Sequence, residues 1–277
     1  MRSYFGLILI LLIVTGCQVG GQQDEGEGQL VWSDEFDYQG QPNSNLWDYS
    51  IGDGCPTLCG WGNNELQYYT SNNKNIRVAD GKLIIEAHKE NVNGKSYSSA
   101  RINSKNKGDW KYGTIEVKAK LPEGRGTWPA IWMLPTNWSY GGWPKSGEID
   151  IMEHVGYDQG NIHGTVHTEA YNHLLGTQKG DSIELASASE KFHIYSVNWS
   201  PEKIDFLVDG EVYNTFTNDE TGSAAWPFDQ PFYLIMNIAV GGNWGGKHGI
   251  DDSIWPQHME IDYVRVYQKA EKQNNNY

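Results

Sequence analysis

Alternation of apolar and polar residues is the main pattern along the chain. In residues 112–121 and 203–209, apolar side chains occupy every second position, and mostly charged residues stand between them. This period of two is typical of β-strands with one buried face, whereas helical periodicity is scarce. Similar runs predict further strands at residues 30–36, 83–88, 148–153, 162–168, 194–199, 232–240 and 259–267.

The segments between these runs are rich in turn-forming residues. Asp209-Gly210 is a tight-turn signal that predicts a hairpin from residues 203–209 into 211–213. Many short strands joined by glycine-rich turns predict an all-β protein, a β-sandwich of the jelly-roll type. We expect one concave face of this sandwich to form a cleft long enough for a polymer.

The first residues form a leader. Arg2 precedes an apolar run over residues 5–14, which is typical of a secretory signal and too short for a membrane-spanning helix. Val14-Thr15-Gly16-Cys17 resembles the lipobox of bacterial lipoproteins, in which cleavage leaves a lipidated cysteine. We therefore expect residues 1–16 to be a lipoprotein signal peptide and Cys17 to anchor an exported bacterial lipoprotein at the outer membrane or cell surface. An ordinary cleaved signal with an incidental cysteine is the alternative.

The rest of the chain predicts one folded domain. Residues 17–28 begin with Cys17 and are otherwise mostly glycine, glutamine and acidic residues without periodicity, which predicts a flexible tether, and residues 269–277 form a polar tail. Residues 29–268 contain no linker-like break and no repeat. A single domain is therefore expected between tether and tail.

The charge balance and the aromatic content restrict the class of partner. The chain has 35 acidic and 21 basic residues and a net charge of −14, which argues against nucleic acid or an anionic membrane surface as the main partner. It also has 12 tryptophans among 277 residues, and such an aromatic surface suits a neutral, ring-shaped, polar ligand. We expect a monomer that contacts the membrane only through its N-terminal lipid.

Cys55 and Cys59 stand in the short segment CPTLC. A zinc site would need two further cysteines or histidines at ligand spacing, and the neighbouring sequence supplies no second pair. In an exported chain a small local disulfide is favoured, and two free thiols are the alternative.

Three carboxylates fall within one predicted strand, in the segment SGEIDIMEH at residues 146–154. Glu148 and Asp150 share one face because successive side chains of a strand alternate, whereas Glu153 has the wrong parity. A β-bulge around Met152 would bring Glu153 to the same polar face. A solvated acidic strand or a calcium-binding face is the structural alternative.

The spacing of the two glutamates suits a defined chemistry. With one residue taken up by the bulge, their α-carbons lie roughly 13 Å apart and their carboxyl groups about 5 to 6 Å apart. Retaining glycosidases hold a nucleophile and an acid/base about 5 to 5.5 Å apart, whereas inverting enzymes leave a wider gap for water. Carboxyl groups this close do not ionise independently, so we expect at least one raised pKa, as a general acid requires.

The segment GEIDIMEHVG resembles the active-site strand of glycoside hydrolase family 16, in the branch with a bulged E-x-D-x-x-E pattern. Further motifs that resemble this family run across nearly the whole chain after the leader: WSDEFD at 32–37, WGNNELQYYT at 61–70, GKLIIEA at 81–87, SARI at 99–102, TWPAIWMLP at 127–135, HGTVHTEAYNH at 163–173, GGNWGG at 241–246 and IDYVRVYQ at 261–268. Within the family they are similar to the laminarinases, which cut β-1,3-glucan internally. The resemblance implies that residues 29–268 form a catalytic domain with a concanavalin A-like jelly roll and need no cofactor for catalysis.

The resemblance also implies roles for single residues. Glu148 matches the nucleophile, Glu153 the general acid/base and Asp150 the assisting acid. His167 matches an active-site histidine, although a strand histidine is otherwise more often structural. The implied substrate-binding residues are the cleft tryptophans Trp128, Trp132 and Trp143, the weaker candidates Trp110 and Trp244, and the hydroxyl-binding Asn63 and Arg101.

Core packing is the alternative for every tryptophan, and those within or beside strand patterns are interpreted as core: Trp32, Trp47 and Trp199. Trp128 and Trp132 are four residues apart and lie on the same side of an extended segment, as platforms for stacking sugar rings would. The glycines around Trp244 indicate either a loop that approaches the ligand closely or a flexible turn.

Glu35, Gly81 and Asp262 match the residues that often hold a structural calcium away from the cleft in this family. Acidic side chains and a backbone oxygen suit a hard cation, which would join the edges of the sandwich and take no part in catalysis.

Together these features predict a retaining endo-glycosidase that hydrolyses internal β-1,3-glucosidic bonds of laminarin-type β-glucans by double displacement. Mixed-linkage β-1,3-1,4-glucan or a marine galactan is an alternative substrate, because loops set polymer specificity. Transglycosylation also remains open. A non-catalytic glucan-binding protein on the same fold is the alternative from another class, and it is disfavoured because all three carboxylates are present.

Overall fold

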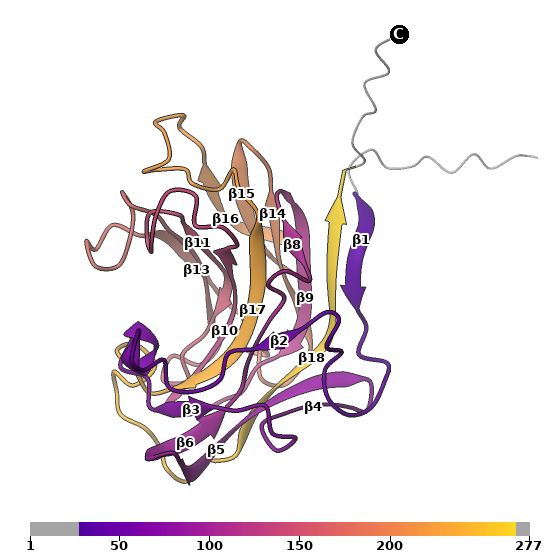
Figure 1. Cartoon of the computed structure of the whole chain (residues 1–277), viewed down its shortest axis with the longest axis vertical. Coiled ribbons are helices and arrows are strands. Elements are labelled where there is room, and N and C mark those ends of the chain that lie inside the picture. Colours follow the sequence, from indigo (N-terminus) through magenta and orange to yellow (C-terminus); the bar gives the residue numbers. More distant parts are fainter. Residues whose placement is uncertain (1–27, 270–277) are drawn as a thin grey trace, which may run out of the picture.

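The structure is a computed structural model that describes residues 28–269. The predicted signal peptide, the lipidation of Cys17, and nearly all of the tether and the tail lie outside the described residues. Two β-sheets and their loops make up the described chain, with one 3-10 segment, η1 (Cys59–Gly62) (Figure 1). Within residues 28–269, no helix is long and apolar enough to cross a membrane.

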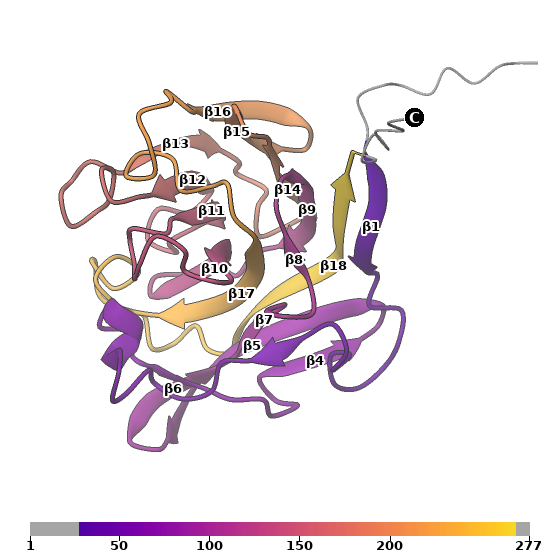
Figure 2. The same ribbon diagram turned by 45° about the horizontal axis from the view of Figure 1, so that its top comes forward.

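The first sheet has ten strands and lies on the far side of the molecule from the candidate site. Its strands are β1 (Gln29–Asp34), β3 (Gln67–Tyr69), β4 (Ile76–Ala79), β5 (Lys82–Val92), β6 (Lys95–Ser99), β9 (Gly113–Lys120), β14 (His193–Trp199), β15 (Lys203–Val208), β16 (Glu211–Thr217) and β18 (Gln257–Gln268). Pairing is antiparallel except between β3 and β6. Gln29 pairs with Gln268, so both ends of the described chain leave the sheet at one place (Figure 2).

The second sheet has eight strands and carries the candidate site. Its strands are β2 (Asp48–Tyr49), β7 (Arg101–Asn103), β8 (Asp109–Trp110), β10 (Thr127–Pro135), β11 (Glu148–Glu153), β12 (Asn161–His167), β13 (Lys179–Glu184) and β17 (Phe232–Val240). The order β13-β12-β11-β10-β17-β7-β2 is antiparallel throughout, and these strands curve strongly, most visibly β17 (Figure 1).

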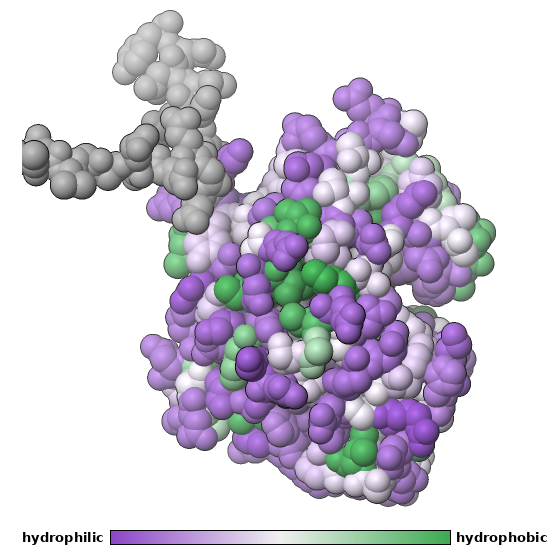
Figure 3. Space-filling view, turned by 180° about the vertical axis from the view of Figure 1, so that it is seen from behind, coloured by the Kyte–Doolittle hydropathy of each residue, from purple (hydrophilic) through white to green (hydrophobic). Residues whose placement is uncertain are grey.

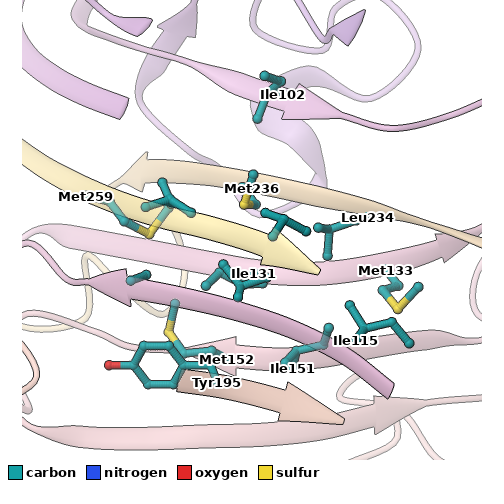
Figure 4. Packing of buried hydrophobic residues seen from close by; sticks show 14 of the residues in the cluster. Ile102, Ile115, Ile131, Met133, Ile151, Met152, Tyr195, Leu234, Met236 and Met259 are labelled. Atoms are coloured by element: carbon teal, nitrogen blue, oxygen red, sulfur yellow. The ribbon is translucent and has the colours of Figure 1, made fainter. Parts of the chain in front are cut away.

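The hydrophobic core fills the space between the two sheets (Figure 4). Ile115 and Tyr195 reach it from the first sheet, and Ile131, Met152 and Met236 reach it from the second. All five are completely buried, as the alternating pattern requires for residues that face inward. The surface opposite the view of Figure 1 is mostly hydrophilic, and its hydrophobic residues form separate small patches (Figure 3).

The predicted all-β sandwich is confirmed, and each predicted run corresponds to a strand. The hairpin at Asp209-Gly210 is also present, with both residues at positive φ between β15 and β16. The strand pattern did not identify β10, β13 or the shorter strands β2, β3, β4, β6, β7 and β8. β10 lacks alternation because nearly all of its residues are buried, and it contains Pro129, which usually argues against a central strand. Proline has no backbone N–H to donate to a neighbouring strand. Pro129 is tolerated because the pairing with β11 ends at Ala130, which faces Glu153, the last residue of β11.

Candidate active site

A β-bulge in β11 brings the three carboxylates to one face of the eight-stranded sheet. Between Asp150 and Glu153, two residues, Ile151 and Met152, oppose the single Ile131 of β10. The register with β12 shifts at the same place. Both bulge side chains are buried in the core, and the extra residue restores the parity of Glu153. The bulge predicted around Met152 is therefore present.

The register across the sheet defines the neighbours of Glu153. It pairs with His163 of β12 and with Ala130 of β10. Ala130 in turn pairs with Asn237 of β17, and Asn237 pairs with Arg101 of β7. Directly paired residues share a face, so these five form one row across the sheet. With strands about 4.8 Å apart, the α-carbons of Arg101 and Glu153 are about 14 Å apart along this row.

Each glutamate receives one indole N–H. Trp143 Nε1 donates to Glu148 Oε2 at 3.0 Å, and Trp128 Nε1 donates to Glu153 Oε1 at 3.0 Å. A hydrogen bond to a carboxylate favours its ionised form and fixes its orientation. Two of the predicted cleft tryptophans therefore contact the predicted catalytic residues directly.

The three carboxyl groups share a dry environment. Burial raises the pKa of Glu148, Asp150 and Glu153 to about 8, and the charge of Asp150 further raises the pKa of both glutamates. Because the groups interact, their protons belong to the cluster as a whole near neutral pH. This is the condition under which one carboxyl group stays protonated as an acid while another is ionised.

His167 lies beside the cluster, opposite Glu148 in the register. Its Nε2 is 3.4 Å from Asp150 Oδ2 and 3.9 Å from Glu148 Oε1. One potential ligand atom from each of the three residues lies within 4.8 Å of the others, so the trio offers mixed nitrogen and oxygen ligands to a metal ion. Calcium prefers oxygen ligands alone, so the histidine disfavours the alternative of a calcium-binding face.

Arg101 stands between two indole rings. Its guanidinium carbon is 4.7 Å from the ring centroid of Trp132 and 4.5 Å from that of Trp61. Trp132 is fixed by its own hydrogen bond, in which Nε1 donates to Asn237 Oδ1 at 2.8 Å. The sequence predicted Trp132 and Arg101 as binding residues but gave no role to Trp61, although this residue begins the motif WGNNELQYYT.

The glycine-rich loop at residues 241–246 packs against the wall of the site. The ring of Trp244 meets that of Trp128 edge-on at 5.6 Å and that of His163 at 5.0 Å. The backbone oxygen of Asn63 accepts a hydrogen bond from the Asn243 N–H at 2.7 Å. A side chain at Gly242 would lie 3.0 Å from the same oxygen, so this loop is closely packed rather than a free turn.

Trp110 is a correction to the sequence prediction. It is 6% exposed and lies in the main core, where its ring meets that of Trp32 edge-on at 5.2 Å. Its strand partner is Phe232, which is fully buried between the sheets. Trp110 therefore faces the core, on the opposite side of the sheet from the carboxylates.

Sequence reasoning also missed Glu65 and His163. Glu65 is buried beside the site, and Gln67 Nε2 donates to its Oε2 at 2.6 Å. Burial raises the pKa of Glu65, and its charge contributes to the raised pKa of Glu153. Both residues lie inside motifs that carry the family resemblance, Glu65 in WGNNELQYYT and His163 at the start of HGTVHTEAYNH, but only the structure shows that they lie near the carboxylates.

Cys55 and Cys59 form a disulfide. It closes a loop of the chain directly before Trp61, and the Gly60 N–H donates to the Asp53 carbonyl at 2.8 Å on the other side of the same loop. The zinc alternative finds no support among residues 28–269, where no further ligands gather at these cysteines.

The residues implied in calcium binding lie on or beside three strands of the first sheet: Glu35 follows β1, Gly81 precedes β5, and Asp262 lies within β18, between β9 and β5. The carboxylates of Glu35 and Asp262 are near enough for the charge of Asp262 to act on Glu35. Glu35 is paired with Arg265 at 2.8 Å and Asp262 with Lys118 at 2.8 Å. Gly81 occupies the turn before β5, which pairs with β18 next to Asp262.

Comparison with known proteins accounts for this constellation. The sequence model of Glycosyl hydrolases family 16 matches residues 63–265, most of the chain. The chain belongs to glycoside hydrolase family 16. The match includes the bulged strand with its three carboxylates, so the chain is a glycoside hydrolase.

Individual relatives are similar over nearly the whole chain. A β-glucanase of Rhodothermus marinus is 51% identical over 95% of this chain and 94% of its own. The crystal structure of the laminarinase from Rhodothermus marinus superposes with a TM-score of 0.84 at 53% identity, over 88% of this chain and 98% of that one. The crystal structure of SCLam, a non-specific endo-β-1,3(4)-glucanase, gives a TM-score of 0.84 at 46% identity, over 88% and 92% of the two chains.

Proposed function

We propose that this family 16 member is a retaining endo-1,3-β-glucanase, a laminarinase. The observation that carries the proposal is the bulged strand β11, which turns Glu148, Asp150 and Glu153 to one face and lets Trp143 and Trp128 hold the two glutamates. The similar laminarinase and β-glucanase of Rhodothermus marinus support β-1,3-glucan as the substrate.

In the first step, the Glu148 carboxylate attacks the anomeric carbon while Glu153 protonates the glycosidic oxygen. The bond between the anomeric carbon and that oxygen breaks, the leaving chain departs with a new hydroxyl group, and Glu148 holds the remaining chain as an ester. In the second step, Glu153 takes a proton from water, which attacks the anomeric carbon and releases Glu148. Two inversions restore the β-configuration.

The surrounding residues set the proton positions for these steps. The indole N–H of Trp143 favours the ionised form of Glu148, as a nucleophile requires. Burial first, and then the charge of Asp150 between the glutamates on the strand, raise the pKa of Glu153, which keeps this acid protonated. His167 Nε2 faces Asp150 Oδ2 at 3.4 Å, without a hydrogen bond between the two atoms.

Mixed-linkage β-1,3-1,4-glucan is the second candidate substrate, because the similar enzyme SCLam is described as a non-specific endo-β-1,3(4)-glucanase. Mass spectrometry of products from laminarin, lichenan, agarose and carrageenan separates the candidates. We expect a ladder of β-1,3-linked oligosaccharides from laminarin early in the reaction, which is the mark of internal cleavage. Products from a galactan alone, or release of glucose alone from chain ends, would contradict the proposal.

For the cell, we propose an exported lipoprotein that is anchored through Cys17 to the outer membrane or cell surface and folds as a monomeric catalytic domain at 29–268. The lipobox-like sequence before Cys17 supports the anchor, and the net charge of −14 opposes direct binding to an anionic membrane. Growth of the producing cell with a labelled fatty acid tests the anchor. Label should enter the protein and be lost in Cys17→Ser, and label retained by that variant would exclude this attachment site.

We also propose a structural calcium held by the carboxylates of Glu35 and Asp262 and the backbone oxygen of Gly81. The charge of Asp262 acts on Glu35, so the two carboxylates are near enough to share a cation, and the side chains of Arg265 and Lys118 would have to give up some of their contacts to it. Addition of calcium to chelator-treated protein should raise the unfolding temperature, and Asp262→Asn should remove most of that increase. An equal increase in both proteins would place the ion elsewhere.

A further inference from the structure

The two indoles around Arg101 come from very different parts of the chain. Trp132 lies on the central strand β10 and pairs with Asp150 in the register. Trp61 lies on η1, which is not part of either sheet. Both rings and the Arg101 side chain are partly exposed, so the stack forms part of the surface of the substrate-binding face.

Stacking holds Arg101 in an unusual way. A guanidinium group has its N–H donors in its own plane, so two aromatic rings whose centroids lie within 4.7 Å of its carbon restrain the group without using those donors. Nε of Arg101 is buried without a hydrogen-bond partner. The two indole rings, rather than a hydrogen bond at Nε, therefore restrain the guanidinium group. The outer N–H groups are thus oriented and remain available for the hydroxyl groups of a sugar.

The position of Trp61 depends on the loop before it. Its backbone has φ of +52°, a left-handed conformation that is uncommon for a bulky residue and persists only where the surroundings impose it. Its Nε1 donates to the Gly52 carbonyl at 3.3 Å, and its ring contacts that of Tyr69 at 5.5 Å. These contacts hold the indole ring of Trp61, but they do not fix the backbone of the residues that precede it.

The disulfide loop supplies the remaining restraint. Cys55 and Cys59 are covalently linked two residues before Trp61. The Leu58 N–H donates to the Gly54 carbonyl at 2.7 Å, and a side chain at Gly54 would lie 2.0 Å from the Leu58 oxygen, so only glycine allows this closure. Lys95 pairs with Asp53 at 3.3 Å and fixes the loop to the first sheet.

We propose that the disulfide loop is a substrate-binding element, which clamps Arg101 between Trp61 and Trp132 to make a binding site for glucan about 14 Å from the acid/base along the cross-strand row. Trp61 and the Cys55–Cys59 link are then specificity determinants for long chains. A sugar held there is not at the scissile bond, so this site contributes to binding and leaves the chemical step unchanged. The inference rests on the proposed glucanase function.

The test compares KM and kcat for laminarin in four proteins: the parent, Trp61→Ala, Trp61→Phe and the double variant Cys55→Ser/Cys59→Ser. Trp61→Ala and the double variant should raise KM about tenfold, equivalent to about 1.4 kcal/mol of binding, with kcat within about twofold of the parent. Trp61→Phe keeps an aromatic face over Arg101 and should recover most of the affinity. The increase should shrink for the shortest laminari-oligosaccharides that are cleaved, because they do not reach Arg101.

Two controls keep the result interpretable. Trp110→Phe alters a core tryptophan and should leave KM unchanged, so a general loss of packing is distinguished from loss of the clamp. Should the double variant fail to fold, reduction of the folded parent by dithiothreitol, with the free thiols counted, gives the same comparison. Unchanged KM in Trp61→Ala and in the reduced protein overturns the inference while the glucanase function stands. A parent that cleaves no laminarin overturns both.

Discussion

Trp143→Phe isolates the hydrogen bond that favours the ionised nucleophile. Phenylalanine keeps an aromatic ring in the site but removes the N–H that lies 3.0 Å from Glu148 Oε2. Glu148 must be ionised to attack, and its pKa is already raised to about 8, first by burial and then by the charge of Asp150. Loss of a donor that favours the anion raises this pKa further.

The expected size follows from the charge on the acceptor. A hydrogen bond to a charged group contributes about 1.5–3 kcal/mol, and one pKa unit corresponds to about 1.4 kcal/mol. The acidic limb of the pH profile of kcat/KM should therefore move upward by about one to two units. Below that limb, kcat/KM should fall about 10- to 100-fold, whereas the alkaline limb should remain in place.

The matched control is Trp128→Phe, which removes the equivalent N–H from Glu153. Glu153 must be protonated in the first step, so a higher pKa of this group extends the alkaline limb to higher pH. Initial rates from reducing-sugar release on laminarin between pH 4 and 10 measure both limbs. If Trp143→Phe moved only the alkaline limb, or if both variants moved the same limb, the assignment of nucleophile and acid would be refuted.

Three further outcomes follow from the same structure. Glu148→Gln should abolish turnover, yet at pH 8 it should unfold at the same temperature as the parent or a higher one. The reason is that a carboxyl group with a folded pKa of about 8 and an ordinary pKa of 4.5 destabilises the fold progressively between those pH values. The difference in unfolding temperature measured by calorimetry should vanish at pH 4, and a difference that grows on acidification would contradict this prediction. Glu260→Gln should destabilise the protein by at most about 3 kcal/mol at pH 7, because the effect of burial on Glu260 is outweighed by Lys120 and Lys82, which lower its pKa to about 2. This loss of stability should disappear as the pH falls from 4.5 towards 2, and denaturant titrations at pH 7 and at low pH would show it. Trp110→Ala should lower the free energy of unfolding by about 3–5 kcal/mol, because Trp110 is buried, and should leave the KM of the folded enzyme unchanged. A raised KM at normal stability would show that Trp110 is a cleft residue after all.

The sequence predicted the fold where one face of a strand is buried and the other is not. β9 shows this alternation plainly, with Ile115, Val117 and Ala119 buried and charged residues between them. β10 is buried on nearly both faces and so has no period to detect, although it carries Trp128 and Trp132. The bulge in β11 could be predicted because Glu148 and Asp150 define the polar face of the strand, and Glu153 would point to the other face without an extra residue.

The site was predictable as far as the local sequence places residues together. Glu148, Asp150 and Glu153 lie on one strand, so spacing alone relates them. Arg101 and Trp61 are related only by the order of the strands and by the disulfide loop, which no local pattern encodes. Trp110 was misplaced because a tryptophan in a two-residue strand carries no parity, and its partner Phe232 reveals the direction of its side chain.

The central claim is that Glu148 and Glu153 act together to retain the β-configuration of the cleaved bond. Proton nuclear magnetic resonance during hydrolysis of a laminari-oligosaccharide at high enzyme concentration observes the anomer that is released before mutarotation. The account predicts that the β-anomer appears first and the α-anomer follows only by mutarotation. Initial release of the α-anomer would show a single displacement by water and contradict the assignment of Glu148 as nucleophile.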